Sequence, residues 1–228
     1  MTNTITSPSI VSPPYANENP PRRYFTRQRR ALSQQQRRLA ASLASSHLYK
    51  LTGQLPKQAR VGLYWDGFGE LPTQPILDWC LRLGYLGYLP VVGSFGCQSG
   101  SMGQDNKVTS QDNKVMRFAA IHQAKLGQLP NTRHHLGMKQ ISSRQLLWAN
   151  DLDLIFCPLV AADLYGNRMG MGGGFYDSTL KDVNRTGRNK TLIIGWCYDF
   201  QVVDRLERQP WDVPLDGLIT PSSLRWFR

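Results

Sequence analysis

Residues 152–177 read "LDLIFCPLVAADLYGNRMGMGGGFYD", an apolar run followed by a short turn and a glycine-rich loop. The run "LDLIFCPLV", 152–160, is apolar on both faces, which is typical of a strand buried within a parallel sheet. The segment "FYDSTLKDV", 175–183, has the composition of a helix. The stretch therefore predicts a core strand joined to a helix through a glycine loop.

Four glycines fall within five positions of that loop: Gly170, Gly172, Gly173 and Gly174. Glycine permits positive φ and lets a ligand approach the main chain, at an entropic cost. The amides of such a loop can point at an anion, most readily where a helix begins. No lysine follows as a P-loop requires, and Phe175 stands where a dinucleotide fingerprint needs glycine. An anion cradle is favoured, because ligands bind at such connections in open α/β sheets; a purely structural turn is the alternative.

Outward from this stretch, predicted strands alternate with predicted helices. Strands are predicted at 60–65, 86–92, 116–121, 191–197 and 217–220, and helices at 22–31, 32–51, 72–85 and 142–150. Within 32–51, Ser33 and Gln36 have capping-box spacing, and Leu39, Leu43 and Leu51 mark one apolar face. The alternation predicts an α/β protein with a mostly parallel sheet covered by helices.

Two segments stand outside this pattern. Residues 1–21 are rich in Ser, Thr, Asn and Pro, and we predict a disordered tail there. Residues 93–115 carry "QDNKV" twice in a polar stretch, which indicates a surface insertion. The remainder, 22–228, is expected to form a single domain.

The charge of the chain is unevenly distributed. The net charge of +11 suggests a nucleic-acid partner. However, residues 1–60 hold ten basic residues against Glu18, whereas residues 61–228 hold seventeen basic and fifteen acidic residues, a balance of +2. The basic segment is interpreted as a solvated helical face, or as one that attracts a polyphosphate or polycarboxylate ligand. An organelle transit peptide is the alternative for the Arg-rich segment up to residue 46.

Cysteine spacing and hydropathy exclude several classes of protein. The four cysteines lie far apart, which argues against a zinc site and a disulfide scaffold. No run of 18 apolar residues exists, so a membrane span is excluded. A cytoplasmic protein with reduced thiols is the simplest expectation.

The stretch 153–177 resembles the 5-formyltetrahydrofolate cyclo-ligase (5,10-methenyltetrahydrofolate synthetase) family. That family has an Asp-Leu-Ile-x-x-Pro strand before a G-x-R-x-G-x-G-x-G-[FY]-Y-D loop. The blocks "RRALS", "DGFGELPTQPIL" and "PWDVPLDGLITPSSL" agree in order, and the similarity covers about residues 22–224. It implies a three-layer α/β fold with helices on both sheet faces, similar to the NagB/RpiA/CoA-transferase-like fold.

The resemblance also implies an activity. ATP, with Mg²⁺, would phosphorylate the formyl oxygen of 5-formyltetrahydrofolate; N10 would then close the ring to 5,10-methenyltetrahydrofolate, releasing ADP and phosphate. A monomeric ligase acting on small molecules is implied, without nucleic-acid or membrane partners. The rivals are an ATP-binding α/β protein of the same fold without folate activity and a basic nucleic-acid-binding protein, whose affinity would fall steeply with salt.

The resemblance assigns roles to particular residues. ATP binding falls to Arg22, Arg168, Gly170, Met171, Gly172, Gly173, Gly174, Phe175 and Tyr176. Arg168 and Tyr176 are the candidate catalytic residues, Glu70 and Tyr176 would bind the folate, and Asp177 and Asp212 would hold Mg²⁺. The alternatives are a surface ion pair for Arg168, packing for Tyr176, helix capping for Asp177 and an ordinary exposed loop residue for Glu70. Asp216 is interpreted as structural.

The chain departs from the family pattern in two places. Glu18 replaces a lysine that the family often carries four residues before the arginine aligned with Arg22, so either Arg23 or Arg27 reaches the phosphates or ATP binding is weakened. The segment "HLGMKQI", 135–141, lacks the family's Glu-Pro pair, which puts one wall of the folate pocket in question. His134 and His135 are interpreted as ordinary loop residues.

Overall fold

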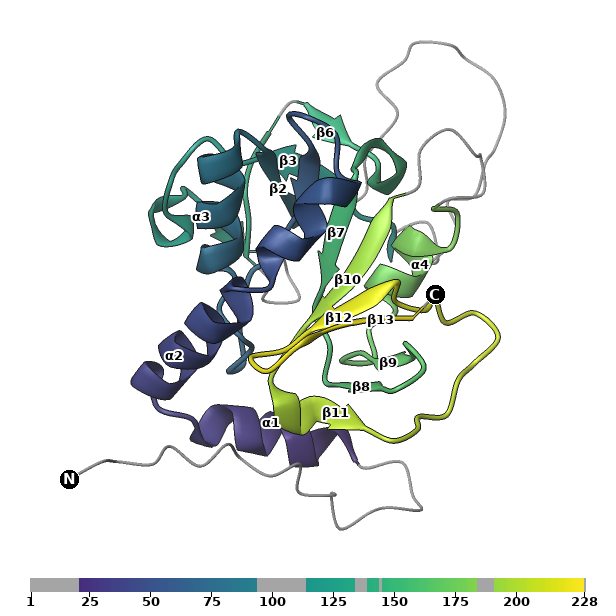
Figure 1. Cartoon of the computed structure of the whole chain (residues 1–228). Coiled ribbons are helices and arrows are strands. Elements are labelled where there is room, and N and C mark those ends of the chain that lie inside the picture. The colour runs from purple at the N-terminus through teal and green to yellow at the C-terminus, as the bar shows by residue number, and fades with distance from the viewer. Residues whose placement is uncertain (1–20, 94–113, 134–138, 144, 184–190, 228) are drawn as a thin grey trace, which may run out of the picture.

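The computed structural model describes residues 21–93, 114–133, 139–143, 145–183 and 191–227 (Figure 1). Its centre is a sheet with strand order β13-β12-β10-β7-β1-β2-β3-β6. The five strands from β12 to β2 are parallel, whereas β13, β3 and β6 each run antiparallel to their inner neighbour. The strand bounds are β1 (Arg60–Gly62), β2 (Leu86–Val91), β3 (Arg117–Ala120), β6 (Leu146–Leu147), β7 (Leu154–Cys157), β10 (Leu192–Trp196), β12 (Gly217–Ile219) and β13 (Leu224–Trp226). The mostly parallel α/β sheet predicted from the sequence is confirmed.

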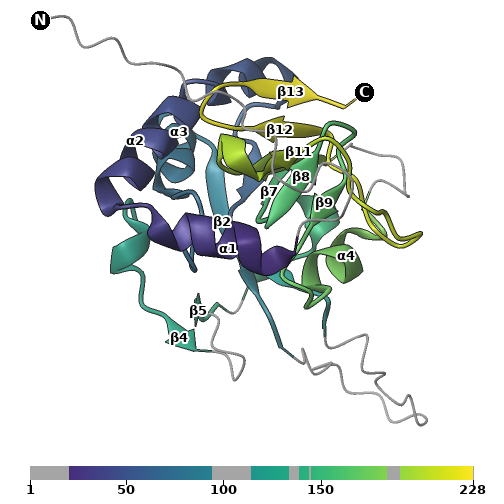
Figure 2. The same cartoon turned by 90° about the horizontal axis from the view of Figure 1, so that it is seen from below.

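The central strand β7 is buried on both faces, as its apolar run predicts. Leu154 and Phe156 point into a core shared with α2 (Gln34–Ser45), η1 (Leu48–Gln54) and α3 (Gln74–Leu83). Ile155 and Cys157 point into a second core, which includes Leu180 of α4 (Phe175–Leu180) and Ala149 of η4 (Ala149–Asp151). Figure 1 shows α2 and α3 on one side of the sheet and α4 on the other. The remaining helix, α1 (Arg22–Ala31), runs below the sheet between α2 and β9 (Figure 2).

A second sheet supports the glycine loop. The strands β8 (Ala161–Asp163) and β9 (Arg168–Met169) form a hairpin, and β11 (Val202–Val203) pairs with β8 in parallel. The carboxylate of fully buried Asp163 holds the hairpin turn, since it accepts from the amides of Tyr165 and Asn167 at 2.9 Å each and from the amide of Leu206 at 3.0 Å. The hairpin therefore delivers residues 170–174 to a fixed place, where the sequence predicted only a turn.

The smaller elements lie between these layers or at their margin. They are η3 (Leu126–Gln128), the paired strands β4 (Thr132–Arg133) and β5 (Lys139–Gln140), and η5 (Asp199–Gln201). In the part of the chain that the structure describes, no helix is both long and apolar enough to cross a membrane.

The capping box is confirmed, but the apolar face predicted for the same helix is wrong. The Gln36 amide donates to the Ser33 hydroxyl oxygen at 3.2 Å, and the Ser33 amide donates to the Gln36 side-chain oxygen at 2.8 Å. Leu39 and Leu43 are 61% and 51% exposed, whereas the third residue of that face, Leu51, lies in η1 and is buried as predicted. The buried positions of α2 are alanines, because small side chains allow the helix to approach its neighbour α3 closely. The single helix predicted over 32–51 is also divided, with α2 ending at Ser45 and η1 following.

The helix predicted at 142–150 is wrong. Leu146 and Leu147 form β6, which pairs with β3, and η4 begins at Ala149. There the Asp151 carboxylate accepts from the Trp148 amide at 2.8 Å, and this bond starts the 3-10 turn. Pairing with the sheet edge thus overrides the local helical composition. The predicted tail, except for its last residue, and residues 94–113 of the predicted insertion lie outside the described residues.

Candidate active site

A cavity of about 980 Å³ lies where β1, β2 and β7 end, at the carboxyl edge of the sheet. Its walls come from the loop after β1, the glycine loop, the start of α1 and the connection over residues 206–212. The structure brings together at this cavity every residue to which the sequence assigned a site role: Arg22, Glu70, Arg168, residues 170–177 and Asp212. Crevices at this edge are where α/β sheets bind ligands.

The glycine loop presents bare backbone to open space. Gly172 and Gly174 have φ of +94° and +71°, which side-chain-bearing residues rarely adopt. A Cβ added at either position would meet no atom within 4 Å. Within the described part of the chain, the amides of residues 171–173 donate to no partner. Arg22 donates from Nε to the Gly170 carbonyl at 2.9 Å and ties the loop to α1. The loop can thus receive an acceptor-rich group such as phosphate.

Arg168 and Asp177 form an ion pair beside the loop. Nη2 of Arg168 lies 2.5 Å from Oδ1 of Asp177, and Nη1 donates to the Val213 carbonyl. The Arg168 side chain is only 3% exposed, so the pair is not the surface ion pair considered as the alternative. Asp177 lies in the first turn of α4, but no side chain caps that helix. The Asp177 carboxylate is 31% exposed and stays accessible from the cavity.

Asp177 and Asp212 are the residues that could hold a magnesium ion arriving with phosphates. Asp177 and Asp212 both line the cavity, and Asp212 also accepts from the Gln209 amide at 2.8 Å. Among the described residues, no group of three or more His, Cys, Asp or Glu could hold a metal. Mg²⁺ is usually held by one or two carboxylates together with substrate phosphates and water. The chain therefore offers part of a coordination shell rather than a complete cage.

Tyr176 places an unsatisfied hydroxyl at the cavity wall. Its phenol oxygen is buried and has no hydrogen-bond partner among the residues that the structure describes. Burial, with the neighbouring Cys157 and Glu70, raises the Tyr176 pKa well above its usual value. The hydroxyl consequently stays protonated and is available to donate to an oxygen of a ligand, since an unsatisfied buried donor is costly.

Glu70 is not an exposed loop residue. Its carboxylate accepts from the Gly67 amide at 3.0 Å and lies 3.6 Å from Nη1 of Arg29 in α1, and its side chain is 10% exposed. Burial raises the Glu70 pKa to about 7, even though the Gly67 hydrogen bond and Arg29 both lower it. This carboxyl changes its charge near neutral pH while lining the cavity.

Several lining residues were not found from the sequence, among them Tyr64, Trp65, Lys139 and Trp211. The Lys139 ammonium lies 5.6 Å from the centroid of the Trp65 ring. Lys139 belongs to the segment 135–141 in which the family's Glu-Pro pair is missing. No alternation or spacing signal marks these residues, because they come from three different parts of the chain.

The arginines of α1 bear on the first departure, in which Arg23 or Arg27 was expected to reach the phosphates. Arg23 and Arg27 do not line the cavity, whereas Arg22 contacts the glycine loop and Arg29 contacts Glu70. The sequence analysis missed Arg29, although its spacing gave a signal. Phe25 and Arg29 are four residues apart and therefore share the buried face of α1. Glu18 lies outside the described residues.

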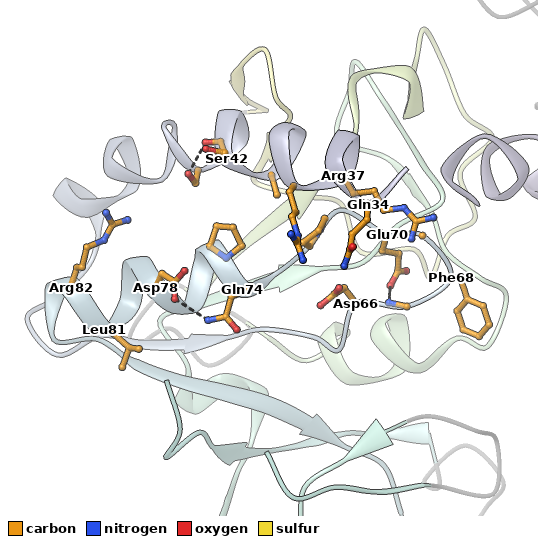
Figure 3. Close-up of a pocket in the computed structure, with 17 residues that line it drawn as sticks. Gln34, Arg37, Ser42, Asp66, Phe68, Glu70, Gln74, Asp78, Leu81 and Arg82 are labelled. Carbon is orange, nitrogen blue, oxygen red and sulfur yellow. Dashed lines mark hydrogen bonds between the residues drawn. The ribbon is translucent and has the colours of Figure 1, made fainter. Parts of the chain in front are cut away.

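A groove of about 920 Å³ continues from the cavity between α2 and α3 (Figure 3). The two spaces share Asp66, Gly67, Phe68 and Glu70. The charged side chains along the groove are Arg37, Arg38, Arg82, Asp66, Glu70 and Asp78. Because acids and bases are equal in number, the groove has no clear preference for a ligand of one charge.

Comparisons with known proteins agree with this geometry. The family model for the 5-formyltetrahydrofolate cyclo-ligase family matches residues 16–221. The 5-formyltetrahydrofolate cyclo-ligase of Escherichia coli K12 is 36% identical over 164 residues, covering 72% of this chain and 79% of that protein. The enzyme of the same name from Haemophilus influenzae is 32% identical over 193 residues, covering 83% and 88%. The solution structure of Aquifex aeolicus 5,10-methenyltetrahydrofolate synthetase superposes with a TM-score of 0.66 at 27% identity, covering 91% of each chain. The chain therefore belongs to the 5-formyltetrahydrofolate cyclo-ligase family and is an enzyme of the ligase class.

Proposed function

We propose that the protein uses ATP and Mg²⁺ to close 5-formyltetrahydrofolate to 5,10-methenyltetrahydrofolate, with release of ADP and phosphate. The observation that carries the proposal is one cavity with two unlike walls. One wall is the open glycine backbone beside Arg168, and the other holds Glu70, with the unsatisfied Tyr176 hydroxyl near both. A polyphosphate suits the first wall, and a nitrogen-rich heterocycle with N–H donors suits a carboxylate.

The reaction has two chemical steps. The formyl oxygen attacks the γ-phosphorus of ATP, the bond to the β-phosphate oxygen breaks, and ADP leaves. N10 then attacks the activated formyl carbon and gives up its proton, and the carbon–oxygen bond breaks so that phosphate departs with the formyl oxygen. Phosphoryl transfer of this kind is catalysed mainly by positioning and by charge stabilisation.

The residues divide this work. The amides of the glycine loop and the planar guanidinium of Arg168 hold the phosphate oxygens, and Arg22 fixes the start of the loop. Tyr176 donates to the formyl oxygen and orients it toward the γ-phosphorus. Glu70, when ionised, accepts from N–H groups of the pterin ring. Asp177 and Asp212 would hold Mg²⁺, which when bound neutralises charge on the phosphates.

The test is the near-ultraviolet absorbance of the methenyl product after mixing the protein with 5-formyltetrahydrofolate and Mg·ATP. We expect a rise that requires ATP, accompanied by one ADP per product. Replacement of Tyr176 by Phe is expected to lower kcat about 10²-fold, on the scale of losing one donor to a developing charge. The proposal would be refuted if folded wild-type protein formed no product when both substrates are present, whichever of the two is in excess.

A further inference from the structure

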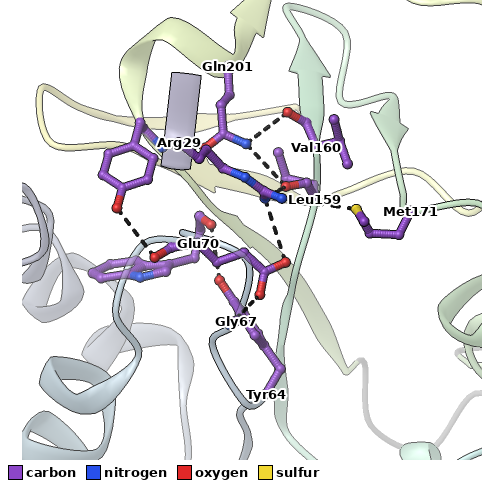
Figure 4. A network of polar contacts seen from close by, with 10 residues as sticks. Arg29, Tyr64, Gly67, Glu70, Leu159, Val160, Met171 and Gln201 are labelled. Carbon is purple, nitrogen blue, oxygen red and sulfur yellow. Dashed lines mark hydrogen bonds and ion pairs between the residues drawn. The ribbon is translucent and has the colours of Figure 1, made fainter. Parts of the chain in front are cut away.

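Arg29 is a fully buried arginine whose guanidinium contacts three residues that line the cavity (Figure 4). Its Nη1 donates to the Leu159 carbonyl at 3.0 Å and lies 3.6 Å from Oε1 of Glu70. Its Nη2 lies 4.0 Å from the sulfur of Met171 in the glycine loop. A buried guanidinium costs several kcal/mol unless it is well paired, so simple packing does not account for it.

The backbone around Arg29 is fixed on the Glu70 side. Gly69 has φ of +79°, and a Cβ there would lie 2.8 Å from the backbone carbon and oxygen of Arg29, so α1 rests directly on the loop after β1. The Gly67 amide donates to the Glu70 carboxylate, and the Tyr198 hydroxyl donates to the Glu70 carbonyl at 3.3 Å. A displacement of Arg29 is therefore transmitted to Glu70.

The opposite side is fixed as well. Gln201 donates from Nε2 to the carbonyls of Leu159 at 3.1 Å and Val160 at 2.8 Å. The Leu159 carbonyl thus accepts from both Gln201 and Arg29 and fixes the position of the Nη1 end of the guanidinium. Met171, which contacts the same guanidinium, lies between Gly170 and Gly172 of the loop that faces the cavity.

We propose that Arg29 is a positioning residue that couples the glycine loop, where ATP binds, to Glu70, where the folate binds. This proposal rests on the proposed function, which assigns ATP to the glycine loop and the folate to Glu70. Arg29 itself contacts neither substrate. In-line transfer needs the formyl oxygen to be close to the γ-phosphorus and aligned with the bond that breaks. A misplacement of about 1 Å can cost about 10²-fold in rate. One rigid guanidinium that contacts both walls keeps these two atoms aligned, which a flexible lysine ammonium cannot do.

The charged surroundings of Glu70 support this role. The titratable groups that act on it or are acted on by it are Arg29 in α1, Asp66 in its own loop, Tyr64 after β1, Tyr176 in α4 and Tyr198 before η5. Of these, only Arg29 is cationic. Its removal therefore shifts the Glu70 pKa upward from about 7, toward the neutral acid at physiological pH.

The test compares Arg29→Met and Arg29→Lys with a matched control, Arg30→Met. Arg30 is the next residue of α1; it is exposed and lies 5.9 Å from the centroid of the Phe68 ring. The Glu70 carboxyl is titrated by carbon NMR in each protein, with Glu70→Gln used for assignment. We expect Arg29→Met to raise the Glu70 pKa, Arg29→Lys to raise it less, and Arg30→Met to leave it unchanged. These titrations need no turnover, so they separate failure of this proposal from failure of the proposed function.

Kinetics complete the test. We expect Arg29→Lys to lower kcat about 10-fold and Arg29→Met about 10²-fold, with the acid limb of the pH–kcat/KM profile moved to higher pH in Arg29→Met. In the Glu70→Gln background the Arg29→Met effect is expected to be at least fivefold smaller, because the two residues act as a unit. Equal losses in Arg29→Met and Arg30→Met, or an unchanged Glu70 titration, would overturn the proposal. Should Arg29→Met fail to fold, the same comparison is read from Arg29→Lys against Arg30→Lys.

Discussion

Two alanine substitutions in the glycine loop separate its folding role from its binding role. Gly172 has φ of +94°, whereas the φ of Gly170 lies outside the left-handed region. An added Cβ meets no protein atom within 4 Å at either position. Gly172→Ala therefore introduces backbone strain without a clash, and Gly170→Ala introduces neither.

The expected magnitudes follow from these differences. A left-handed conformation costs a residue with a side chain roughly 1–2 kcal/mol, which in a chain of this size lowers Tm by about 2–8 °C. Gly170→Ala should leave Tm within about 1 °C of the wild type, because a substitution that adds neither strain nor a clash changes the unfolding free energy very little. The methyl group occupies cavity space, however. Loss of one hydrogen bond to a charged phosphate costs about 1.5–3 kcal/mol, so we expect the Kd for Mg·ATP to rise about 10- to 100-fold.

The assay is thermal unfolding followed by calorimetric titration with Mg·ATP for both variants and the wild type. The expected pattern is a lower Tm in Gly172→Ala and weakened ATP binding with unchanged Tm in Gly170→Ala. A Gly170→Ala protein that binds Mg·ATP as tightly as the wild type would refute the assignment of the open loop backbone to phosphate. A fall in its Tm as large as that of Gly172→Ala would refute the backbone geometry.

Three further predictions concern the carboxylates. The proposed function has Glu70 bind the folate as an anion, so kcat/KM should fall as pH drops below about 7; Glu70→Gln should remove this acid limb and raise the KM for folate about 10-fold or more, about the loss of one charged hydrogen bond. Chelation of Mg²⁺ should abolish turnover, and Asp177→Asn should raise the Mg²⁺ concentration needed for half-maximal rate about 10-fold, because one of few carboxylate ligands is lost; a metal-independent rate would contradict this. Asp216 accepts from the Ile193 amide at 2.9 Å, so Asp216→Ala should cost about 1–3 kcal/mol of unfolding free energy without changing the KM for ATP; a selective change in that KM would place Asp216 in the site instead.

The parts of the fold that local pattern decides were predictable from the sequence. The run at 152–160 is apolar on both faces because β7 lies between two cores, and the Ser33–Gln36 spacing marks the start of α2 directly. The helix predicted at 142–150 failed because Leu146 and Leu147 pair with a strand that lies more than twenty residues earlier. A sheet edge supplied by a distant segment leaves no local signal.

The candidate site was predictable only where its residues are close in sequence. The segment 168–177 supplies one wall as a unit, so the resemblance located it completely. Arg29 and Glu70 approach each other only because Gly69 lets α1 rest on the loop after β1. Likewise, Lys139 and Trp65 approach each other from segments far apart in the chain. Contacts of this kind depend on how the layers are assembled, which composition and spacing do not encode.

The most direct measurement follows the formyl oxygen of the substrate. 5-Formyltetrahydrofolate labelled with the heavy oxygen isotope in the formyl group is turned over with unlabelled Mg·ATP, and the released phosphate is analysed by mass spectrometry. Phosphorylation of the formyl oxygen predicts one labelled oxygen in each phosphate, because that oxygen leaves with phosphorus when the ring closes. Label that appears in water while the phosphate stays unlabelled would contradict the account, since ATP would then be hydrolysed without passing through the formyl group.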